Sequence, residues 1–576
     1  MQPSGAEHRR FWPLAALALI LALWIAHGAA SDAPAHAAPP GRGVAGFIRD
    51  AHGDPVADAD LRLYADGDSK PMVEAISQLD GAYLLILPDT ADISSLKVFV
   101  ERPHFVSLTW RPDASQLAVI LQPDSLLTND IVLQRRIDLS FWIAALVFAG
   151  MLLVIALERI HTTLAALLGV AVIFTISAVG GAFSPNLVVF SFDQAIRYVD
   201  FDVIFLLLGM MIVIGVVEST GVFQWLAFWA YRLSKGRIWL LAVILMLITF
   251  VTSSLLDNAI SMLLITPITL EIALVLGINP LSLLIPALLS ANVGGAATLI
   301  GTPVNIIIGS YARLGFNGFL ANLTPGILLC EAGLIGYCLL RYRQDHATPP
   351  RKPSRALLKR LETNSRIEDV PKLRKALIVF GGLILLFIFG EVIHLTPAVA
   401  AILGAVVMLL WVHPDIEQMM GVVDWTTLVF FMALFMLVGA INEVGLLSLA
   451  ADAISGLVGA SLPLAVLAVV WVSALLSAVV DNIPFAAAML PVVAYLSRVV
   501  PGGAGPILFV ALAVGANLGG NGLLIGSSAN LVVAGISDRA GYRLTFRRFF
   551  EAGFPALLIT TAIGCGWLFL HFTAAR

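Results

Sequence analysis

Residues 291–305 read Ala-Asn-Val-Gly-Gly-Ala-Ala-Thr-Leu-Ile-Gly-Thr-Pro-Val-Asn, and the same pattern recurs later in the chain. Residues 516–530 read Ala-Asn-Leu-Gly-Gly-Asn-Gly-Leu-Leu-Ile-Gly-Ser-Ser-Ala-Asn, with eight of fifteen positions identical at an offset of 225. Upstream, at an offset of 224, Ser253, Asp257, Asn258 and Pro267 recur as Ser477, Asp481, Asn482 and Pro491. Duplicated polar, Gly-interrupted segments in corresponding halves of an apolar chain are typical of a secondary transporter's binding site.

The composition places the chain in a membrane. It is 59% hydrophobic and 12% charged, whereas soluble domains carry about a quarter charged residues. Apolar runs of about 20 residues, long enough to span a bilayer, recur from residue 139 onward. Cys330, Cys338 and Cys565 all lie in apolar segments, so neither a disulfide framework nor a thiolate metal site is expected. We expect no enzymatic activity, no cofactor, no bound transition metal and no nucleic-acid partner.

The N-terminal part differs from the rest. Residues 1–37 carry Arg9-Arg10, a short apolar run and an Ala-His-Ala cleavage candidate, which predicts a signal peptide or an N-terminal membrane anchor. Residues 41–135 are charged and rich in turn signals, which predicts a small extracytoplasmic β-sandwich that resembles the carboxypeptidase regulatory-like type. Strands are expected at 44–48, 60–64, 82–87, 96–101 and 117–121. A passive cap or docking module is favoured there over a catalytic one.

The remainder is expected to be an all-α polytopic membrane protein with inverted-topology repeats and broken helices or re-entrant hairpins. We divide it into a first permease repeat (138–340), a basic linker (341–375) and a second permease repeat (376–572). Spans are expected at 139–157, 162–183, 202–219, 238–256, 258–276, 281–310, 318–340, 376–394, 396–411, 425–445, 463–480, 483–497, 506–532 and 551–571, with 281–310 and 506–532 broken.

Charge predicts the orientation of the two repeats. The linker carries eleven basic and four acidic residues, which the positive-inside rule places in the cytoplasm. The first repeat follows an exported domain and therefore enters from outside, whereas the second follows the linker and enters from inside. The two copies then have opposite orientations, which is an inverted repeat. A role of the linker in binding anionic lipid or a regulatory partner stays open.

The Gly-Gly segments are the first candidate site. Adjacent glycines weaken a helix by about 1 kcal/mol each, and unwound backbone inside a bilayer is tolerated only where protein buries it or it lines a cavity. Close helix packing is the alternative, but amides and hydroxyls accompany the glycines and offer oxygen ligands for an ion. The proposed substrate- or ion-binding residues are Asn258, Asn482, Asn292, Gly294, Gly295, Thr298, Thr302, Asn305, Asn517, Gly519, Gly520, Asn521, Ser527, Ser528 and Asn530.

The two Asp residues are the second candidate site. An ionisable side chain inside an apolar stretch is a functional-site hypothesis by default. Ser253 and Asp257 share a helix face, as do Ser477 and Asp481, because each pair is spaced i,i+4. We expect these four residues to couple transport to H⁺ or Na⁺. The alternatives are that each Asp is a carboxylic acid that stays protonated, or that it caps a helix at a re-entrant turn. Single acids at 218, 271, 331, 391 and 443 are expected at membrane interfaces.

Several long motifs in order carry a family resemblance. They are "LLGMMIVIGVVESTGVF", "AYRLSKGRIW", "SSLLDNAISMLLITPIT", "GGAATLIGTPVNIIIGSYA", "SAVVDNIPFAAAMLPV" and "LGGNGLLIGSSANLVVAG". Over about 138–572 the chain resembles ArsB/NhaD-type permeases of the ion transporter superfamily, and within it the melanosomal P-protein type. The resemblance implies a scaffold domain, a mobile transport domain, a homodimer and an elevator motion. The Ser-Asn-Thr hairpin tips of the dicarboxylate carriers are missing at 253–258 and 477–482.

We therefore predict a multi-pass transporter of the cell (inner) membrane with residues 41–135 outside the cytoplasm. It would move an inorganic ion such as arsenite, antimonite or Na⁺, or another small anion, driven by the proton or sodium gradient, and Na⁺ is the candidate bound ion. A Na⁺- or H⁺-coupled dicarboxylate or citrate symporter is the alternative within transport. A transporter-like sensor or receptor is the alternative from another class.

Overall fold

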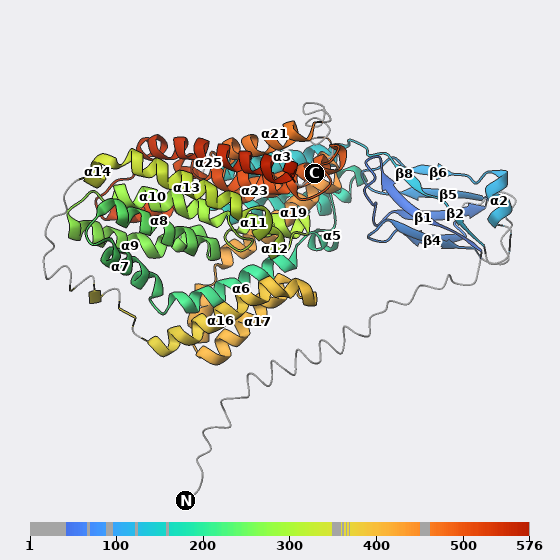
Figure 1. Cartoon of the computed structure of the whole chain (residues 1–576). Helices are drawn as coiled ribbons and strands as arrows, with labels where there is room; N and C mark the ends of the chain where they lie inside the picture. Colours follow the sequence, from blue (N-terminus) through green and yellow to red (C-terminus); the bar gives the residue numbers. More distant parts are fainter. Residues whose placement is uncertain are drawn as a thin grey trace, which may run out of the picture. The chain divides into compact units, whose positions relative to one another are not determined.

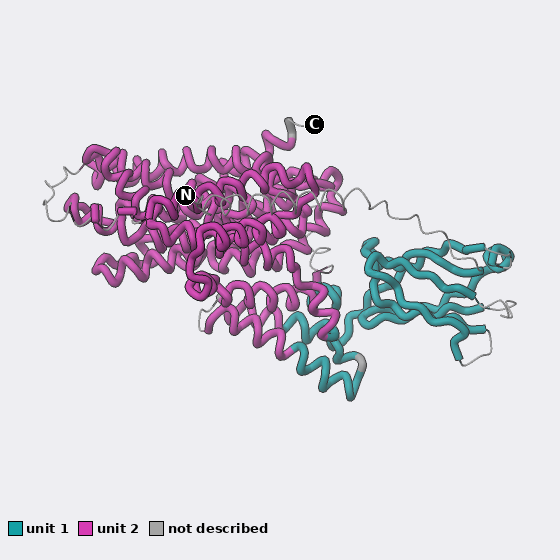
Figure 2. The backbone as a smooth tube through the Cα atoms, turned by 90° about the horizontal axis from the view of Figure 1, so that it is seen from below, with its two compact units in different colours: residues 1–146, 173–191, 440–446 teal, residues 147–172, 192–439, 447–576 magenta. Residues whose placement is uncertain are grey.

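The computed structural model describes residues 42–574 except 66–69, 88–95, 121, 123–124, 157–159, 348–358, 360–361, 364–365, 368, 448 and 450–460. The expected signal peptide or anchor at 1–37 and much of the basic linker lie outside the described residues. The chain divides into two compact units (Figure 2). Unit 1 comprises residues 1–146, 173–191 and 440–446, and unit 2 comprises 147–172, 192–439 and 447–576.

Unit 1 contains two four-stranded sheets (Figure 1). In the first, β1 (Gly43–Asp50) pairs antiparallel with β4 (Ala82–Ile86) and parallel with β7 (Leu126–Thr128) and β8 (Ile131–Leu133). The second has the antiparallel order β3 (Val73–Ile76), β2 (Asp60–Ala65), β5 (Leu96–Glu101), β6 (Leu108–Trp110).

The two sheets share one apolar core. Alternate residues are buried in β2 and β5, among them Leu61, Leu63, Val98 and Val100, and they join Ile48 of β1 in a single cluster. This period of two is what a half-buried strand requires.

The expected strand at 117–121 is wrong, because α2 (Ala114–Ile120) is a helix. The Asp113 carboxylate accepts a hydrogen bond from the Gln116 amide (2.8 Å) and caps the helix start, a local signal that outweighs the apolar run.

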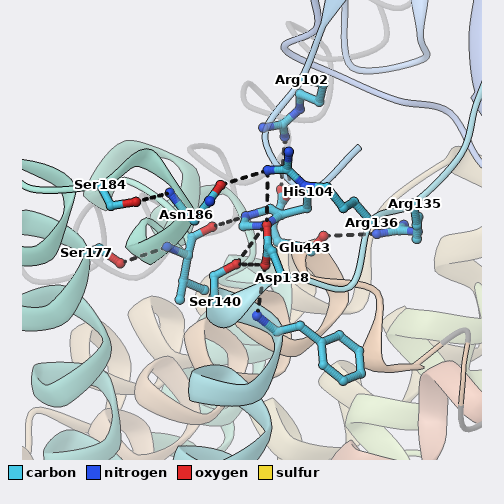
Figure 3. A network of polar contacts seen from close by, with 12 residues as sticks. Arg102, His104, Arg135, Arg136, Asp138, Ser140, Ser177, Ser184, Asn186 and Glu443 are labelled. Atoms are coloured by element: carbon cyan, nitrogen blue, oxygen red, sulfur yellow. Dashed lines mark hydrogen bonds and ion pairs between the residues drawn. The ribbon is translucent and has the colours of Figure 1, made fainter. Parts of the chain in front are cut away.

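A polar network joins the strand region of unit 1 to the helical segments of the same unit (Figure 3). Arg102 donates to both carboxylate oxygens of Glu443, at 3.1 and 3.3 Å, and its Nε donates to the Ala57 carbonyl. Arg135 donates to the carbonyls of Asn442 and Glu443, which are the last carbonyls of a helix and attract cations. Two arginines from the strand region therefore hold the last turn of α19 (Trp425–Glu443).

His104 is the second centre of this network. Its Nε2 lies 2.8 Å from the Val189 carbonyl, and its Nδ1 lies 3.0 Å from the Ser140 hydroxyl and 3.5 Å from the Asp138 carboxylate. Ser140 also donates to Asp138. His104 and Ser140 are fully buried, so each of these polar groups depends on the others for a partner.

Unit 2 is helical, and the structure confirms a polytopic membrane chain. Among the described residues, nine helices are at least 18 residues long and apolar enough to cross a membrane. The α-helices of the first half, of which α3 and α4 lie partly in unit 1, are α3 (Leu139–Ala156), α4 (Thr162–Thr175), α5 (Phe192–Arg197), α6 (Phe201–Glu218), α7 (Val222–Ser234), α8 (Ile238–Leu255), α9 (Asn258–Leu276), α10 (Leu281–Gly295), α11 (Pro303–Ala312), α12 (Phe316–Asn322) and α13 (Thr324–Arg341). Those of the second half are α16 (Val370–Phe389), α17 (Pro397–Val412), α18 (Ile416–Val422), α19, α21 (Leu462–Ser477), α22 (Asn482–Val499), α23 (Ile507–Gly519), α24 (Ser528–Arg539) and α25 (Phe546–Ala574).

The helices of the two halves correspond in order and in packing. α8 packs on α10 as α21 packs on α23, and the two last helices, α13 and α25, pack on each other (Figure 1). The expected breaks are present: non-helical backbone separates α10 from α11, and a short η4 turn (Leu524–Gly526) separates α23 from α24. Both Gly-Gly pairs lie where the first helix of each broken span ends.

The His104 network gives a pH prediction. Burial raises the pKa of the Asp138 carboxyl, but the hydrogen bond from Ser140 and the nearby imidazole lower it by more, so the pKa lies below its usual value. A carboxyl with a lowered pKa stabilises the fold at pH values above its ordinary pKa of about 3.9, and this contribution is lost as the pH falls through the folded-state value. Asp138→Asn should therefore lower the melting temperature of the detergent-solubilised protein at pH 7, and this difference should shrink on acidification below about pH 4. A difference that stays constant with pH would contradict the assignment.

Candidate functional site

The four duplicated asparagines bind one another reciprocally. Thr302 Oγ1 donates to Asn517 Oδ1 (2.9 Å), and its counterpart Ser527 Oγ donates to Asn292 Oδ1 (3.1 Å). Asn517 Nδ2 donates to Asn305 Oδ1 (2.7 Å), and its counterpart Asn292 donates to Asn530 Oδ1 (3.0 Å). These four hydrogen bonds between the copies form two matched pairs that run in opposite directions, so the two motifs form one interlocked unit.

The same asparagines also satisfy the backbone at the helix breaks. Asn305 Nδ2 donates to the carbonyls of Gly295 (3.1 Å) and Thr298 (2.7 Å). Asn530 Nδ2 donates to those of Gly520 (2.8 Å) and Leu523 (3.0 Å). Buried carbonyls that lose their helical partner must find another donor. The side-chain amides thus replace the hydrogen bonds that the breaks remove.

The glycines permit close contact between helices. A Cβ on Gly294 would lie 2.4 Å from the Phe250 carbonyl oxygen of α8, and one on its counterpart Gly519 would lie 2.7 Å from the Ala474 carbonyl of α21. A Cβ on Gly295 would lie 2.1 Å from Asn258 Oδ1. The alternative interpretation, helix packing through small residues, therefore describes the glycines, while the amides around them carry the hydrogen bonding.

Both Asp residues cap helices at matching tips. Asp257 accepts a hydrogen bond from the Ala259 amide (2.8 Å) at the start of α9, and Asp481 accepts one from Ile483 (3.0 Å) at the start of α22. Ser253 and Ser477 fix these tips to the broken spans, because they donate to the carbonyls of Ala291 and Ala516, both at 2.7 Å. The capping alternative is therefore present in the structure, and it leaves one carboxylate oxygen of each Asp outside that capping hydrogen bond.

The two carboxylates line the same cavity in unit 2. It has a volume of about 370 Å³ and is bounded on its apolar side by α6 residues such as Met210 and Ile214 and by Phe430. Its polar lining comes from Asp257, Asp481, Asp424, His161, Thr162, Thr163, Thr426, Thr427 and Ser528. Two acids that lie 224 residues apart in the chain are thus brought to one space.

Six helices begin at this cavity: α4, α9, α11, α19, α22 and α24. A helix N-terminus carries about half a positive charge. Three of the six are capped by carboxylates, Asp257, Asp481 and Asp424, the last accepting from the Thr427 amide at 3.1 Å. At the start of α24, Ser527 makes no capping hydrogen bond. Three carboxylates and six helix starts roughly balance in charge, so the binding of one cation would leave the cavity positive.

The sequence-predicted residues separate into two groups. Asp257, Asp481 and Ser528 line the cavity, whereas the buried amides behind it hold the two copies together. Asn258 accepts from Ser253 and donates to Asn292, Asn521 accepts from Asn292, and Thr298 donates to the Ser254 carbonyl. Asn482 is the first residue of α22 and is buried.

Asp424 was not predicted from the sequence. Its carboxylate accepts hydrogen bonds from the hydroxyls of Thr426 and Thr427, and it lines the same cavity as Asp257. The signal was available: Val199-Asp200-Phe201 and Val423-Asp424-Trp425 lie at the same offset of 224 as the two Asp-Asn motifs. Asp200 caps α6 as Asp424 caps α19.

Comparison with known proteins identifies the family. Residues 152–506, more than half of the chain, match the family model described as "Citrate transporter". The chain belongs to this citrate transporter family. The predicted resemblance to P-protein-type permeases of the ion transporter superfamily is confirmed, and the family and its relatives are transporters rather than enzymes.

The relatives extend from bacteria to mammals. An uncharacterized transporter of Mycobacterium tuberculosis is 34% identical over 75% of this chain and 98% of its own length. The human P protein is 35% identical over 76% of this chain, and the match covers 60% of that longer protein. A solved structure of the Alcanivorax borkumensis YdaH transporter aligns with a TM-score of 0.47 and 16% identity, covering 76% of this chain and 98% of its own.

The glycine contacts give a stability prediction. Gly294→Ala should force α8 and α10 apart, since its Cβ would meet backbone atoms, and overpacking of this kind costs about 1–3 kcal/mol. The matched control is Gly336→Ala on α13, where no atom lies within 4 Å of the new Cβ. Thermal unfolding in detergent should show a lower midpoint for the first variant alone. Equal midpoints would show that the contact between α8 and α10 is not tight.

Proposed function

We propose that the chain is a secondary active ion transporter whose substrate and coupling cation bind in the cavity between Asp257 and Asp481. The observation that carries the proposal is the convergence of two acidic helix tips, one from each repeat, on a space where six helices begin. The polytopic helical architecture and the membership of the citrate transporter family support the same function.

The charge balance of the cavity supports coupling. With its carboxylates ionised, the cavity offers oxygen ligands to H⁺ or Na⁺. Once Asp257 or Asp481 has bound a cation, the positive helix starts are no longer balanced and attract an anion. The free end of α24 beside Ser528 is the best-placed position for that anion, because no side chain caps it. Cation and anion binding then reinforce each other, which is the requirement for coupled movement of the two in the same direction, whereas exchange of Na⁺ for H⁺ would require the two cations to compete for the same carboxylates.

The first candidate substrate is an inorganic ion, such as arsenite or antimonite, or Na⁺ itself in exchange for protons. The second is a di- or tricarboxylate, and two observations favour it: the description of the family and the helix starts that suit carboxylate groups. The departure from the hairpin tips of dicarboxylate carriers argues for the inorganic ion. A cavity of about 370 Å³ has room for either substrate.

The wider arrangement is part of the proposal. We propose opposite orientations for the two repeats, a cytoplasmic basic linker, an extracytoplasmic strand region with a β-sandwich fold, and a location in the inner membrane. The two matched pairs of reciprocal hydrogen bonds between the copies support the two-fold relation. A homodimer working by an elevator motion follows from the family resemblance. A sensor function would use the same fold without net flux.

Flux through liposomes tests the proposal. Protein reconstituted into liposomes should accumulate a labelled ion when a proton or sodium gradient is imposed. Asp257→Asn and Asp481→Asn should each reduce gradient-driven uptake by about tenfold or more, which corresponds to about 1.4 kcal/mol or more of lost cation binding. The matched control is Asp538→Asn, an exposed acid on α24 away from the cavity lining.

The same assay separates the alternatives. Arsenite, Na⁺, chloride, succinate and citrate are offered in turn, with and without a gradient. A sensor would move none of them, and a channel would conduct without accumulation against a gradient. Unchanged uptake and an unchanged pH profile in both Asp variants would show that these acids do not couple transport.

A further inference from the structure

Glu331 is a carboxyl group buried in the middle of a membrane helix. It is the eighth residue of α13, and only 3% of its surface is exposed. The expectation that this acid lies at a membrane interface is wrong, because α13 is one of the candidate membrane spans and Glu331 faces its protein neighbours. A buried intramembrane acid is costly and needs a functional or structural reason.

Its surroundings provide one hydrogen bond and no counter-ion. The Ser290 hydroxyl of α10 donates to Glu331 Oε1 at 2.7 Å. Oε2 is fully buried and has no hydrogen-bond partner among the described residues. No described Lys, Arg or His forms an ion pair with Glu331.

The described helices packed on α13 place no charged side chain at the position of Glu331 along the span. They are α25, α10, α12, α14 (Arg343–Ala347) and α8, and α8, α10 and α12 contain no titratable residue. On α25, Arg547, Arg548 and Glu551 lie in the exposed first turns and His571 at the other end. Arg343, Asp345 and His346 of α14 follow the end of α13. Within α13 itself the other titratable residues are Cys330, Tyr337 and Cys338, with Arg341 in its last turn. On α25 the titratable residue within the span is Cys565.

An unpaired ion in this position would cost several kcal/mol, whereas a neutral carboxylic acid would leave only one O–H group without an acceptor. The side chain therefore holds a proton in this conformation. The orphaned oxygen still costs about 1–3 kcal/mol, which would be relieved wherever a movement of α13 against α10 admits water.

The second copy lacks the hydroxyl that holds this acid. At the offset of 225 that aligns the two motifs, Ser290 corresponds to Gly515, and a Cβ on Gly515 would lie 2.5 Å from the Val470 carbonyl. The hydrogen bond from Ser290 to Glu331 is thus an addition to one copy, placed two residues before Asn292 of the interlocked motif.

We propose that Glu331 is a proton-binding site of the transport cycle, separate from the cavity, that is loaded in this conformation and unloaded when α10 and α13 shift. The proton comes from and returns to water, and no other reactant is involved. This inference rests on the proposed function, because a proton site has a role in coupling only if the protein transports. The hydroxyl that holds this acid, Ser290, is present in the first repeat and is replaced by Gly515 in the second.

The test uses Glu331→Gln in full-length protein in liposomes. The amide keeps the shape of the side chain and can still accept from Ser290, but it cannot exchange a proton. We expect substrate counterflow, which needs no net proton movement, to stay within about twofold of wild type. Proton-driven accumulation should fall to the level seen without a gradient, and the pH dependence of uptake should be lost. Glu218→Gln, at the end of α6, is the matched control and should behave like wild type.

Infrared spectroscopy of the purified protein gives a second readout that needs no transport. The wild-type spectrum at neutral pH should contain a protonated-carboxyl band that is missing in Glu331→Gln and present in Glu218→Gln. An ionised Glu331, or a Glu331→Gln protein with wild-type proton-driven accumulation and pH profile, would overturn the inference. If wild-type protein transports nothing while the infrared band is present, the proposed function fails and the proton site has no transport role.

Discussion

The reciprocal hydrogen bonding between the asparagine side chains of the two copies is the constraint on which the rest of unit 2 depends. A broken helix inside a membrane exposes carbonyls that lipid cannot satisfy. Asn305 and Asn530 donate to those carbonyls at the two breaks, and Asn292 and Asn517 tie each break to the other copy. Because Asn305 and Asn530 each donate to their own break and accept a hydrogen bond from the opposite copy, these two side chains join the two breaks to each other. This pairing positions the capped tips at Asp257 and Asp481.

The site has two parts. Buried amides behind the cavity hold the geometry, and titratable carboxylates line the cavity itself. The amides of Asn292, Asn305, Asn517 and Asn530 are buried and hydrogen-bonded to one another and to the backbone, so they are suited to holding geometry rather than to exchanging ligands. The carboxylates of Asp257, Asp481 and Asp424 line the open space, where cations can reach them. The two copies are not equivalent, since Ser290 corresponds to Gly515, Thr298 to Leu523, and Thr302-Pro303 to Ser527-Ser528. Both copies therefore contribute the same asparagine side chains to the frame, whereas other polar side chains occur in only one of the two copies.

The sequence predicted the features that follow from local chemistry and from duplication. The length of the apolar runs predicted the membrane spans, and the paired glycines predicted the helix breaks. The repeated Asp-Asn motif predicted the two acids that line the cavity. The sequence did not predict which residues far apart in the chain form hydrogen bonds with each other. Asn292 and Asn530 lie 238 residues apart, and nothing local distinguishes an amide that satisfies a distant backbone from one that binds an ion. Glu331 shows the same limit, because its significance lies in a missing counter-ion. The helix at Ala114–Ile120 was missed because an apolar run that short fits either period.

Cysteine accessibility tests the central claim most directly, namely that the cavity at the two acidic tips is the transport site and the asparagine frame stays closed behind it. The native thiols Cys330, Cys338 and Cys565 are buried and give little background. Ile260→Cys on the cavity wall should react with a membrane-impermeant reagent from one side of a liposome at a time. The transported ion should protect it, and a thiol at the buried Val293 beside the frame should not react. Labelling at Val293 but not at Ile260, or labelling of Ile260 that the transported ion leaves unchanged, would contradict the account.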